Sequence, residues 1–181
     1  MYRAARRTPW WFCTCGECRF DLSPDDPSGL GTLYAGTDPV TGVVEMIGPE
    51  SSHRPISRKF LASRTIWTLG YDRGLDVADL QHPSALGFGV TNELASMVPY
   101  DVPQMWATAL AAQSLDGLRY RTRFSTGPVA TGLAIFDEAG SKDWIALAYC
   151  RADDDEILAE LDDRGIQVVD VPLSASMEIL E

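Results

Sequence analysis

The sequence has little of what marks membrane, secreted or nucleic-acid-binding proteins. No apolar run is long enough to span a membrane, and the aromatic cluster at residues 10–12 is far too short for the core of a signal peptide. Acidic residues outnumber basic ones by 26 to 15, and the resulting net charge of −11 opposes binding to nucleic acid or to an anionic membrane. We therefore expect a cytoplasmic protein with neither kind of partner.

Several common catalytic signatures are also absent. The chain contains no nucleophile elbow, phosphate-binding loop, Rossmann glycine fingerprint or metalloprotease helix. Its two histidines, His53 and His82, have no Ser or Cys partner at a spacing typical of a hydrolase. We interpret both histidines as surface residues.

Cysteine is scarce, and three of the four cysteines lie in one short segment. Cys13, Cys15 and Cys18 form a C-x-C-x-x-C motif, but structural zinc sites usually pair two such elements and no second pair follows. In a cytoplasmic chain we expect buried or reactive thiols in place of a disulfide framework, and we predict no metal. If a metal did bind, a fourth ligand could come from Cys150, His53 or His82.

What is present is typical of one compact domain over residues 1–181. The chain is 45% hydrophobic and 23% charged, and it is long enough to bury a core. Predicted strands and helices are interspersed without strict alternation, which favours an α+β fold over a doubly wound α/β sheet. We expect strands at 33–35, 66–69, 75–80, 118–124, 132–136, 144–150 and 166–171, and helices at 38–48, 54–64, 92–97, from 102, and at 154–161.

Three polar side chains in the first quarter of the chain suggest a dinucleotide site. They are Arg19 after the cysteine cluster, Tyr34 in an apolar strand, and Glu45 on the helix at 38–48. A fixed guanidinium suits a diphosphate, an aromatic face suits a pyridinium ring, and a carboxylate suits a developing sugar cation. The combination fits an enzyme that cleaves the glycosidic bond of a dinucleotide such as NAD⁺.

Each of these residues also has a plainer interpretation. Arg19 could form an ion pair with Asp21 or Asp25, and Tyr34 could be a core tyrosine whose hydroxyl has one partner. Glu45 lies well away from the centre of the apolar stripe of its helix. Periodicity does not decide whether Glu45 is solvated or lines a cleft. The apolar stripe consists of Val40, Val43, Val44 and Ile47.

A predicted strand in the second half of the chain alternates strictly. Period two puts its three arginines on one face and Tyr120, Thr122 and Phe124 on the other. One interpretation is a solvated arginine face over a core face. The other places the Thr122 hydroxyl in a cleft, with Arg121 or Arg123 near a phosphate.

The chain resembles the RES domain, which occurs in bacterial toxins paired with Xre-type antitoxins. The resemblance covers about residues 2–150 and depends on short segments that occur in the expected order. These segments are residues 2–4, 16–21, 31–35, Glu45, 75–80, 116–123 and 133–136.

The resemblance implies a fold like that of ADP-ribosyltransferase toxins and an enzyme that degrades NAD⁺. Such a phosphorylase or glycohydrolase would take NAD⁺ as substrate, use phosphate or water as acceptor, need no cofactor, and be neutralised by an Xre-type antitoxin. By position, Arg19 is the motif arginine, Tyr34 the pocket tyrosine and Glu45 the motif glutamate. Thr122 stands where the family has a serine, and Ser125 is a substitute if the register differs.

We therefore expect two sets of site residues and keep other functions open. The alternatives are an ADP-ribosyltransferase that modifies a macromolecule, a catalytically silent binding module favoured by threonine at the serine position, and a zinc-binding structural protein. The acceptor and the oligomeric state, including a homo-oligomer, stay open. The expected catalytic residues are Glu45, Arg19 and Thr122, and the expected substrate-binding residues are Arg19, Tyr34, Glu45, Arg121 and Arg123.

Overall fold

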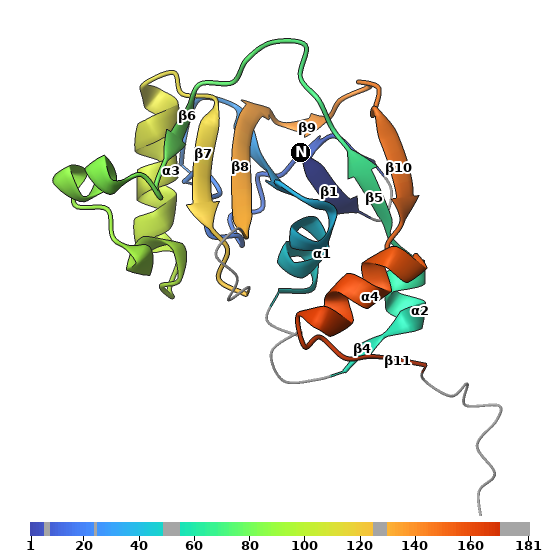
Figure 1. The fold of residues 1–181 in the computed structure, drawn as a ribbon. Coiled ribbons are helices and arrows are strands. Elements are labelled where there is room, and N and C mark those ends of the chain that lie inside the picture. The colour runs from blue at the N-terminus through green and yellow to red at the C-terminus, as the bar shows by residue number, and fades with distance from the viewer. Residues whose placement is uncertain (6–7, 24, 49–54, 125–129, 171–181) are drawn as a thin grey trace, which may run out of the picture.

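A seven-stranded sheet runs through the centre of the computed structural model, which describes residues 1–5, 8–23, 25–48, 55–124 and 130–170 (Figure 1). The strand order is β10-β5-β1-β3-β8-β7-β6, and every neighbouring pair is antiparallel except β6 with β7. The strands are β1 (Tyr2–Ala5), β3 (Leu30–Gly36), β5 (Thr65–Thr68), β6 (Val77–Asp79), β7 (Gly117–Arg121), β8 (Thr131–Glu138) and β10 (Ala148–Arg151).

Two small ribbons and six helical segments complete the described fold. One ribbon pairs β2 (Trp11–Phe12) with β9 (Gly140–Ser141), and the other pairs β4 (Ile56–Ser57) with β11 (Val168–Val169). This mixture of a mostly antiparallel sheet with separate helices confirms the predicted α+β class. The helices are α1 (Pro39–Ile47), α2 (Arg58–Ala62), α3 (Asp101–Ala112) and α4 (Asp155–Asp163), with 3₁₀ segments η2 (Pro83–Phe88) and η3 (Asn92–Ala95).

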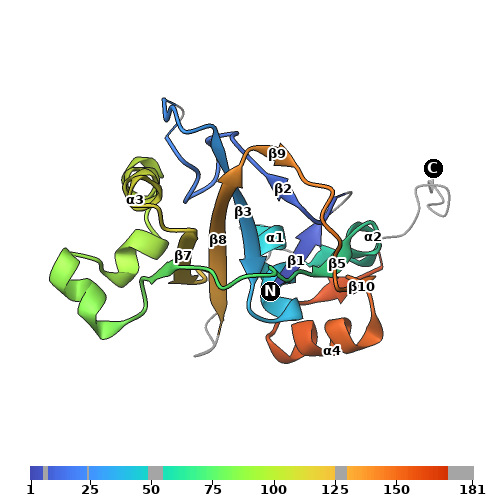
Figure 2. The same cartoon turned by 90° about the horizontal axis from the view of Figure 1, so that it is seen from above.

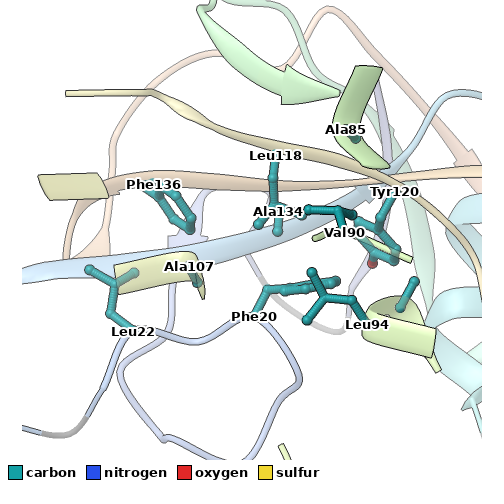
Figure 3. Packing of buried hydrophobic residues seen from close by; sticks show 11 residues of the cluster. Phe20, Leu22, Ala85, Val90, Leu94, Ala107, Leu118, Tyr120, Ala134 and Phe136 are labelled. Atoms are coloured by element: carbon teal, nitrogen blue, oxygen red, sulfur yellow. The ribbon is translucent and has the colours of Figure 1, made fainter. Parts of the chain in front are cut away.

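The helices divide the core into clusters along the sheet. In both views α3 lies at the β7 end, α4 at the opposite end, and α1 between them (Figures 1 and 2). One cluster joins α3, η2 and η3 to inward side chains of β7 and β8, and Phe20 packs within it (Figure 3). A second cluster joins α1 to α4 and β5, and a third lies around Trp10. Burial of these clusters supplies most of the stability of the fold.

Helix α1 begins and ends at the residues that the sequence indicates. The Asp38 carboxylate accepts a hydrogen bond of 2.8 Å from the backbone N–H of Thr41, Pro39 occupies the first turn, and Gly48 is the C-cap. A Cβ atom at Gly36 would lie 2.5 Å from the backbone nitrogen of Gly42. Glycine at position 36 therefore allows α1 to lie close against β3, which fixes the direction in which Glu45 points.

Most expected elements are present, with a few differences. The stretch expected as a helix from 54 to 64 is the strand β4 followed by the short helix α2 over its described part. Only the end of the expected strand at 144–150 pairs, as β10 with β5, and one further backbone hydrogen bond of 2.8 Å joins the Leu147 N–H to the carbonyl oxygen of Thr68. No helix in the described ranges is both long enough and apolar enough to cross a membrane.

Candidate functional site

A cavity of about 550 Å³ opens where α1, β1, β3, β7 and the segment around Cys18 meet. Its size lies within the range of small-molecule sites. Arg19, Tyr34 and Glu45 all line it. The structure thus brings together the three side chains that the sequence places in one hypothetical dinucleotide site.

Glu45 reaches the cavity from the edge of the buried face of α1. The predicted stripe of Val40, Val43, Val44 and Ile47 is buried, and Glu45 beside it is half-buried. Its Oε2 accepts a hydrogen bond from the Tyr120 hydroxyl, whereas its Oε1 is buried with no hydrogen-bond partner among the described residues. Burial raises the pKa of Glu45, and the Tyr120 hydrogen bond and the charge of Arg19 act in the opposite direction. Oε1 can therefore accept a hydrogen bond from a ligand.

Tyr120 is a site residue that the sequence analysis did not identify. Its side chain is 1% exposed, its ring centre lies 4.8 Å from that of Phe20, and its hydroxyl group borders the cavity at Glu45. Burial and the neighbouring Glu45 raise the pKa of Tyr120 well above its usual range, so the hydroxyl stays a donor. The strict alternation of β7 already placed Tyr120 on the inward face, but nothing local indicates its partner.

Arg19 is only 8% exposed and has no ion pair with an acidic residue in the described part of the chain. One Nη donates a hydrogen bond of 2.6 Å to the carbonyl oxygen of Ala95, and the guanidinium lies 5.1 Å from the ring centre of Tyr100. Its Nε is buried without a partner among the described residues. The ion pair with Asp21 or Asp25 that the sequence left open is not present, and a buried cation with neutral partners suits an anionic ligand.

The hydroxyl group of Tyr34 makes two hydrogen bonds, one more than the plainer interpretation requires. The hydroxyl accepts a hydrogen bond of 2.8 Å from the backbone N–H of Phe20 and donates one of 3.0 Å to Oδ1 of Asp21. Burial, with Asp21 nearby, raises the pKa of Tyr34 well above its usual range. The ring is therefore neutral and fixed in orientation at the cavity wall.

The remaining predicted residues do not join this group. The alternation of β7 is confirmed, with Arg121 and Arg123 exposed and Thr122 buried. None of the three is among the described residues that line the cavity. The arginines point away from the face that carries Tyr120, and Thr122 lies on that face with its hydroxyl buried and without a described partner. Arg123 lies 5.3 Å from the ring centre of Phe124, and Ser125 lies outside the described residues.

A second arginine, Arg3, borders the cavity although the sequence analysis gave it no role. It lies on β1 and donates hydrogen bonds of 3.1 Å and 2.8 Å to the carbonyl oxygens of Pro9 and Trp11. Burial lowers the pKa of Arg3 to about 10, which still leaves it charged at neutral pH. Among the described residues, the cavity lining thus contains two arginines together with the acidic residues Glu17 and Glu45.

The cysteine segment folds beside the cavity, and Cys13 and Cys18 border it. The ligand atoms of Cys15, Cys18 and Asp21 all lie within 4.8 Å of one another. The expectation of buried thiols is wrong for this segment, because Cys13 is only half-buried and Cys15 and Cys18 are exposed. Partial desolvation nevertheless raises the pKa of Cys15 and the pKa of Cys18, so both thiols are protonated at neutral pH, and this opposes the prediction of reactive thiols. The other candidate metal ligands do not belong to this group. Cys150 is on β10, and His82 caps η2 through Ser84. His53 lies outside the described residues.

Comparison with family models gives a match to the RES domain over residues 1–152. The chain belongs to the RES domain family. The RES domain is associated with enzymes that act on NAD⁺ and with pairing to Xre antitoxins, which supports an NAD-related, toxin-like function. No curated protein matches the chain. The matched region contains every residue that lines the cavity, whereas α4 lies beyond it.

Proposed function

We propose that this RES domain protein cleaves the bond between nicotinamide and ribose in NAD⁺, with phosphate or water as acceptor. The observation that carries the proposal is the buried Oε1 of Glu45, which has no hydrogen-bond partner among the described residues, on a side chain that lines the same cavity as Arg19. A carboxylate in this position can act on a sugar only if the sugar is bound inside the cavity.

Glu45 supplies the electrostatic part of the reaction. Nicotinamide leaves as a neutral base, so the barrier lies in the positive charge that grows on the ribose. A carboxylate that accepts a ribose hydroxyl at Oε1 stabilises this charge more in the transition state than in the ground state. The Tyr120 hydroxyl donates a hydrogen bond of 2.7 Å to Oε2 and so leaves Oε1 as the oxygen available to the substrate.

Arg19 and Arg3 supply the binding of phosphate groups. The Nε of Arg19 has no partner in the described part of the chain, and Ala95 and Tyr100 fix the guanidinium, so Arg19 offers a preorganised donor to the diphosphate. Arg3 provides the further cation that phosphate would need as an acceptor. Arg121 and Arg123, on the exposed face, have no such part in this scheme.

Tyr34 and Tyr100 supply aromatic surface to the cavity. A pyridinium ring is attracted to an aromatic face, and the fixed hydroxyl of Tyr34 orients that face at no further cost on binding. Thr122 has no part in this scheme, because it is not among the described residues that line the cavity, although Tyr120 and Phe124 on the same face are. The position of the family serine is then occupied by Thr122, a buried residue outside the described cavity lining.

We further propose that the protein is the cytoplasmic toxin of a toxin–antitoxin pair. Depletion of NAD⁺ would be the toxic event, and an Xre-type protein would prevent it. The family association with NAD⁺ and with Xre antitoxins supports this role.

The test is to incubate purified protein with NAD⁺, with and without phosphate, and to separate the products. The proposal predicts free nicotinamide together with ADP-ribose or its phosphorylated form, and the phosphate dependence identifies the acceptor. NAD⁺-derived label on added protein or nucleic acid would instead indicate a macromolecular ADP-ribosyltransferase. No nicotinamide under either condition, at high protein concentration, would refute NAD⁺ cleavage.

A further inference from the structure

The cysteine segment and Asp21 form a compact group of metal-ligating atoms beside the cavity. The sulfur atoms of Cys15 and Cys18 and a carboxylate oxygen of Asp21 lie within 4.8 Å of one another. Ligating sulfur atoms around zinc stand about 3.8 Å apart, since the Zn–S distance is about 2.3 Å and the geometry is tetrahedral. A small inward movement of two side chains would therefore bring the three atoms to ligand distance.

Cys13 is the nearest candidate for a fourth ligand. Its Sγ accepts a hydrogen bond of 3.2 Å from the backbone N–H of Cys15, although it is not among the ligand atoms that lie within 4.8 Å of one another, so its side chain would have to turn toward them. The backbone of Cys13 is tied to Thr32 of β3 by two hydrogen bonds of 2.9 Å and 2.8 Å. One end of the segment is thus fixed to the central sheet before any metal binds.

Asp21 brings a buried negative charge to the group. Its side chain is 0% exposed, yet in the described part of the chain it has no ion pair with Lys, Arg or His. Its Oδ2 accepts hydrogen bonds from the Cys18 N–H at 3.0 Å and from the Cys15 thiol at 3.3 Å. With the Tyr34 hydroxyl on Oδ1, three hydrogen bonds offset part of the desolvation of this carboxylate, and a bound cation would offset more of it.

We propose that Cys13, Cys15, Cys18 and Asp21 bind one zinc ion. Three sulfur ligands select zinc over magnesium and calcium, and three thiolates with one carboxylate give a closed, structural, four-coordinate site. Each thiol releases its proton when it binds the metal. No second C-x-x-C pair follows in the sequence, and Asp21, three residues after Cys18, takes the place of a further ligand.

The position of the site gives it a consequence for the cavity. Arg19 directly follows Cys18, and the other oxygen of Asp21 accepts the hydrogen bond from Tyr34. Zinc would therefore fix the segment that carries Arg19 and the carboxylate that orients Tyr34. The inference concerns the metal alone and holds whether or not NAD⁺ is the substrate.

The experiment measures zinc in the full-length protein, purified without chelator, exposed to excess zinc and then freed of unbound metal. Elemental analysis gives the stoichiometry, and absorption of the cobalt-exchanged protein reports thiolate ligation. The variants are Cys15→Ser and Cys18→Ser, with Cys150→Ser as the matched control because Cys150 is an exposed thiol on β10. Circular dichroism checks that each variant is folded, and chelator-induced zinc release from the wild-type protein gives a readout that needs no variant.

We expect about one zinc per chain in the wild type and in Cys150→Ser, with a thiolate-to-cobalt absorption band. In Cys15→Ser and Cys18→Ser we expect affinity to fall at least about tenfold, as loss of a ligand requires. Wild-type protein with less than about a tenth of an equivalent would overturn the site. Equal zinc in all the variants would also overturn it, as would a disulfide within the segment that forms without any metal binding.

Discussion

The hydroxyl group of Tyr120 donates a hydrogen bond of 2.7 Å to Oε2 of Glu45, and the two residues are 75 positions apart in the sequence. The contact joins β7 to α1 across one wall of the cavity. Gly132 on β8 lies opposite Tyr120, and a Cβ atom there would come within 2.5 Å of the tyrosine ring. The glycine thus leaves the space that lets Tyr120 reach Glu45.

Glu45→Gln is expected to retain or increase stability at neutral pH. Burial raises the pKa of Glu45 above its ordinary 4.5, so between that value and the raised pKa the folded state holds a proton that the unfolded state has released. The free energy of unfolding therefore falls as pH rises through this window, and glutamine, which does not ionise, escapes the loss. Thermal unfolding at pH 7.5 and below pH 4.5 measures it, and the advantage of the variant should vanish in acid.

Glu138→Gln is the matched control for that measurement. Glu138 is exposed and its ion partner Lys142 lowers its pKa, so its contribution has the opposite sign. The control variant should show no gain at neutral pH. A Glu45→Gln protein that is less stable than wild type at neutral pH and equal to it in acid would contradict the assignment of burial as the dominant cause.

Tyr120→Phe is expected to shift the acid limb of the pH–activity profile to higher pH. The Tyr120 hydrogen bond lowers the pKa of Glu45, so its removal raises that pKa further, and the active carboxylate form is lost at a higher pH. The variant also leaves Oε2 unpaired, which should cost about 1–3 kcal/mol of unfolding free energy. Profiles of kcat/KM against pH and chemical denaturation provide the two readouts.

Tyr71→Phe is the control for the loss of a tyrosine hydroxyl. The Tyr71 hydroxyl is buried without a hydrogen-bond partner among the described residues and does not border the cavity. This substitution should leave the pH profile in place. An acid limb that does not move in Tyr120→Phe would show that Glu45 is not the group that titrates.

Arg19→Lys is expected to raise KM for NAD⁺ by about tenfold or more, with a smaller change in kcat. An ammonium group cannot stack over Tyr100 with a planar face, nor can it direct several N–H donors at a diphosphate. Arg121→Lys is the matched control, because Arg121 is exposed and outside the cavity lining, and its KM should change less than about twofold. Equal effects of the two substitutions on KM would remove Arg19 from substrate binding.

Thr122→Val is expected to leave kcat/KM within about twofold of wild type. Valine keeps the shape of threonine, and the lost hydroxyl is buried without a described partner, so stability should be unchanged or higher. Steady-state kinetics with NAD⁺ check this. A loss of about a hundredfold would show that the hydroxyl acts in the reaction, as the family serine position suggests.

Local signals in the sequence were sufficient for the elements that carry the site. Asp38, Pro39 and Gly48 define the ends of α1, and its valine stripe sets the buried face that leaves Glu45 at the edge. Strict alternation likewise separates the arginine face of β7 from Tyr120. Both results follow from periodicity and capping, which act over a few residues.

The contacts that make these residues a site could not be predicted in the same way. Arg19 meets Ala95 and Tyr100, and Tyr120 meets Glu45, only because the sheet brings distant segments together. Arg3 lies on β1, a strand that was not predicted from the sequence, and no local pattern marks it as a site residue. Such pairings depend on register and crossing geometry, which a single sequence does not encode in any short pattern.

The central claim is that Glu45 makes this cavity an NAD⁺-cleaving site, and nicotinamide release by wild-type and Glu45→Gln proteins tests it most directly. At equal concentrations of folded protein, the account predicts release by the wild type and a loss of about a hundredfold or more in the variant. Equal rates in the two proteins, or no release by the wild type at any pH at which it is folded, would contradict it.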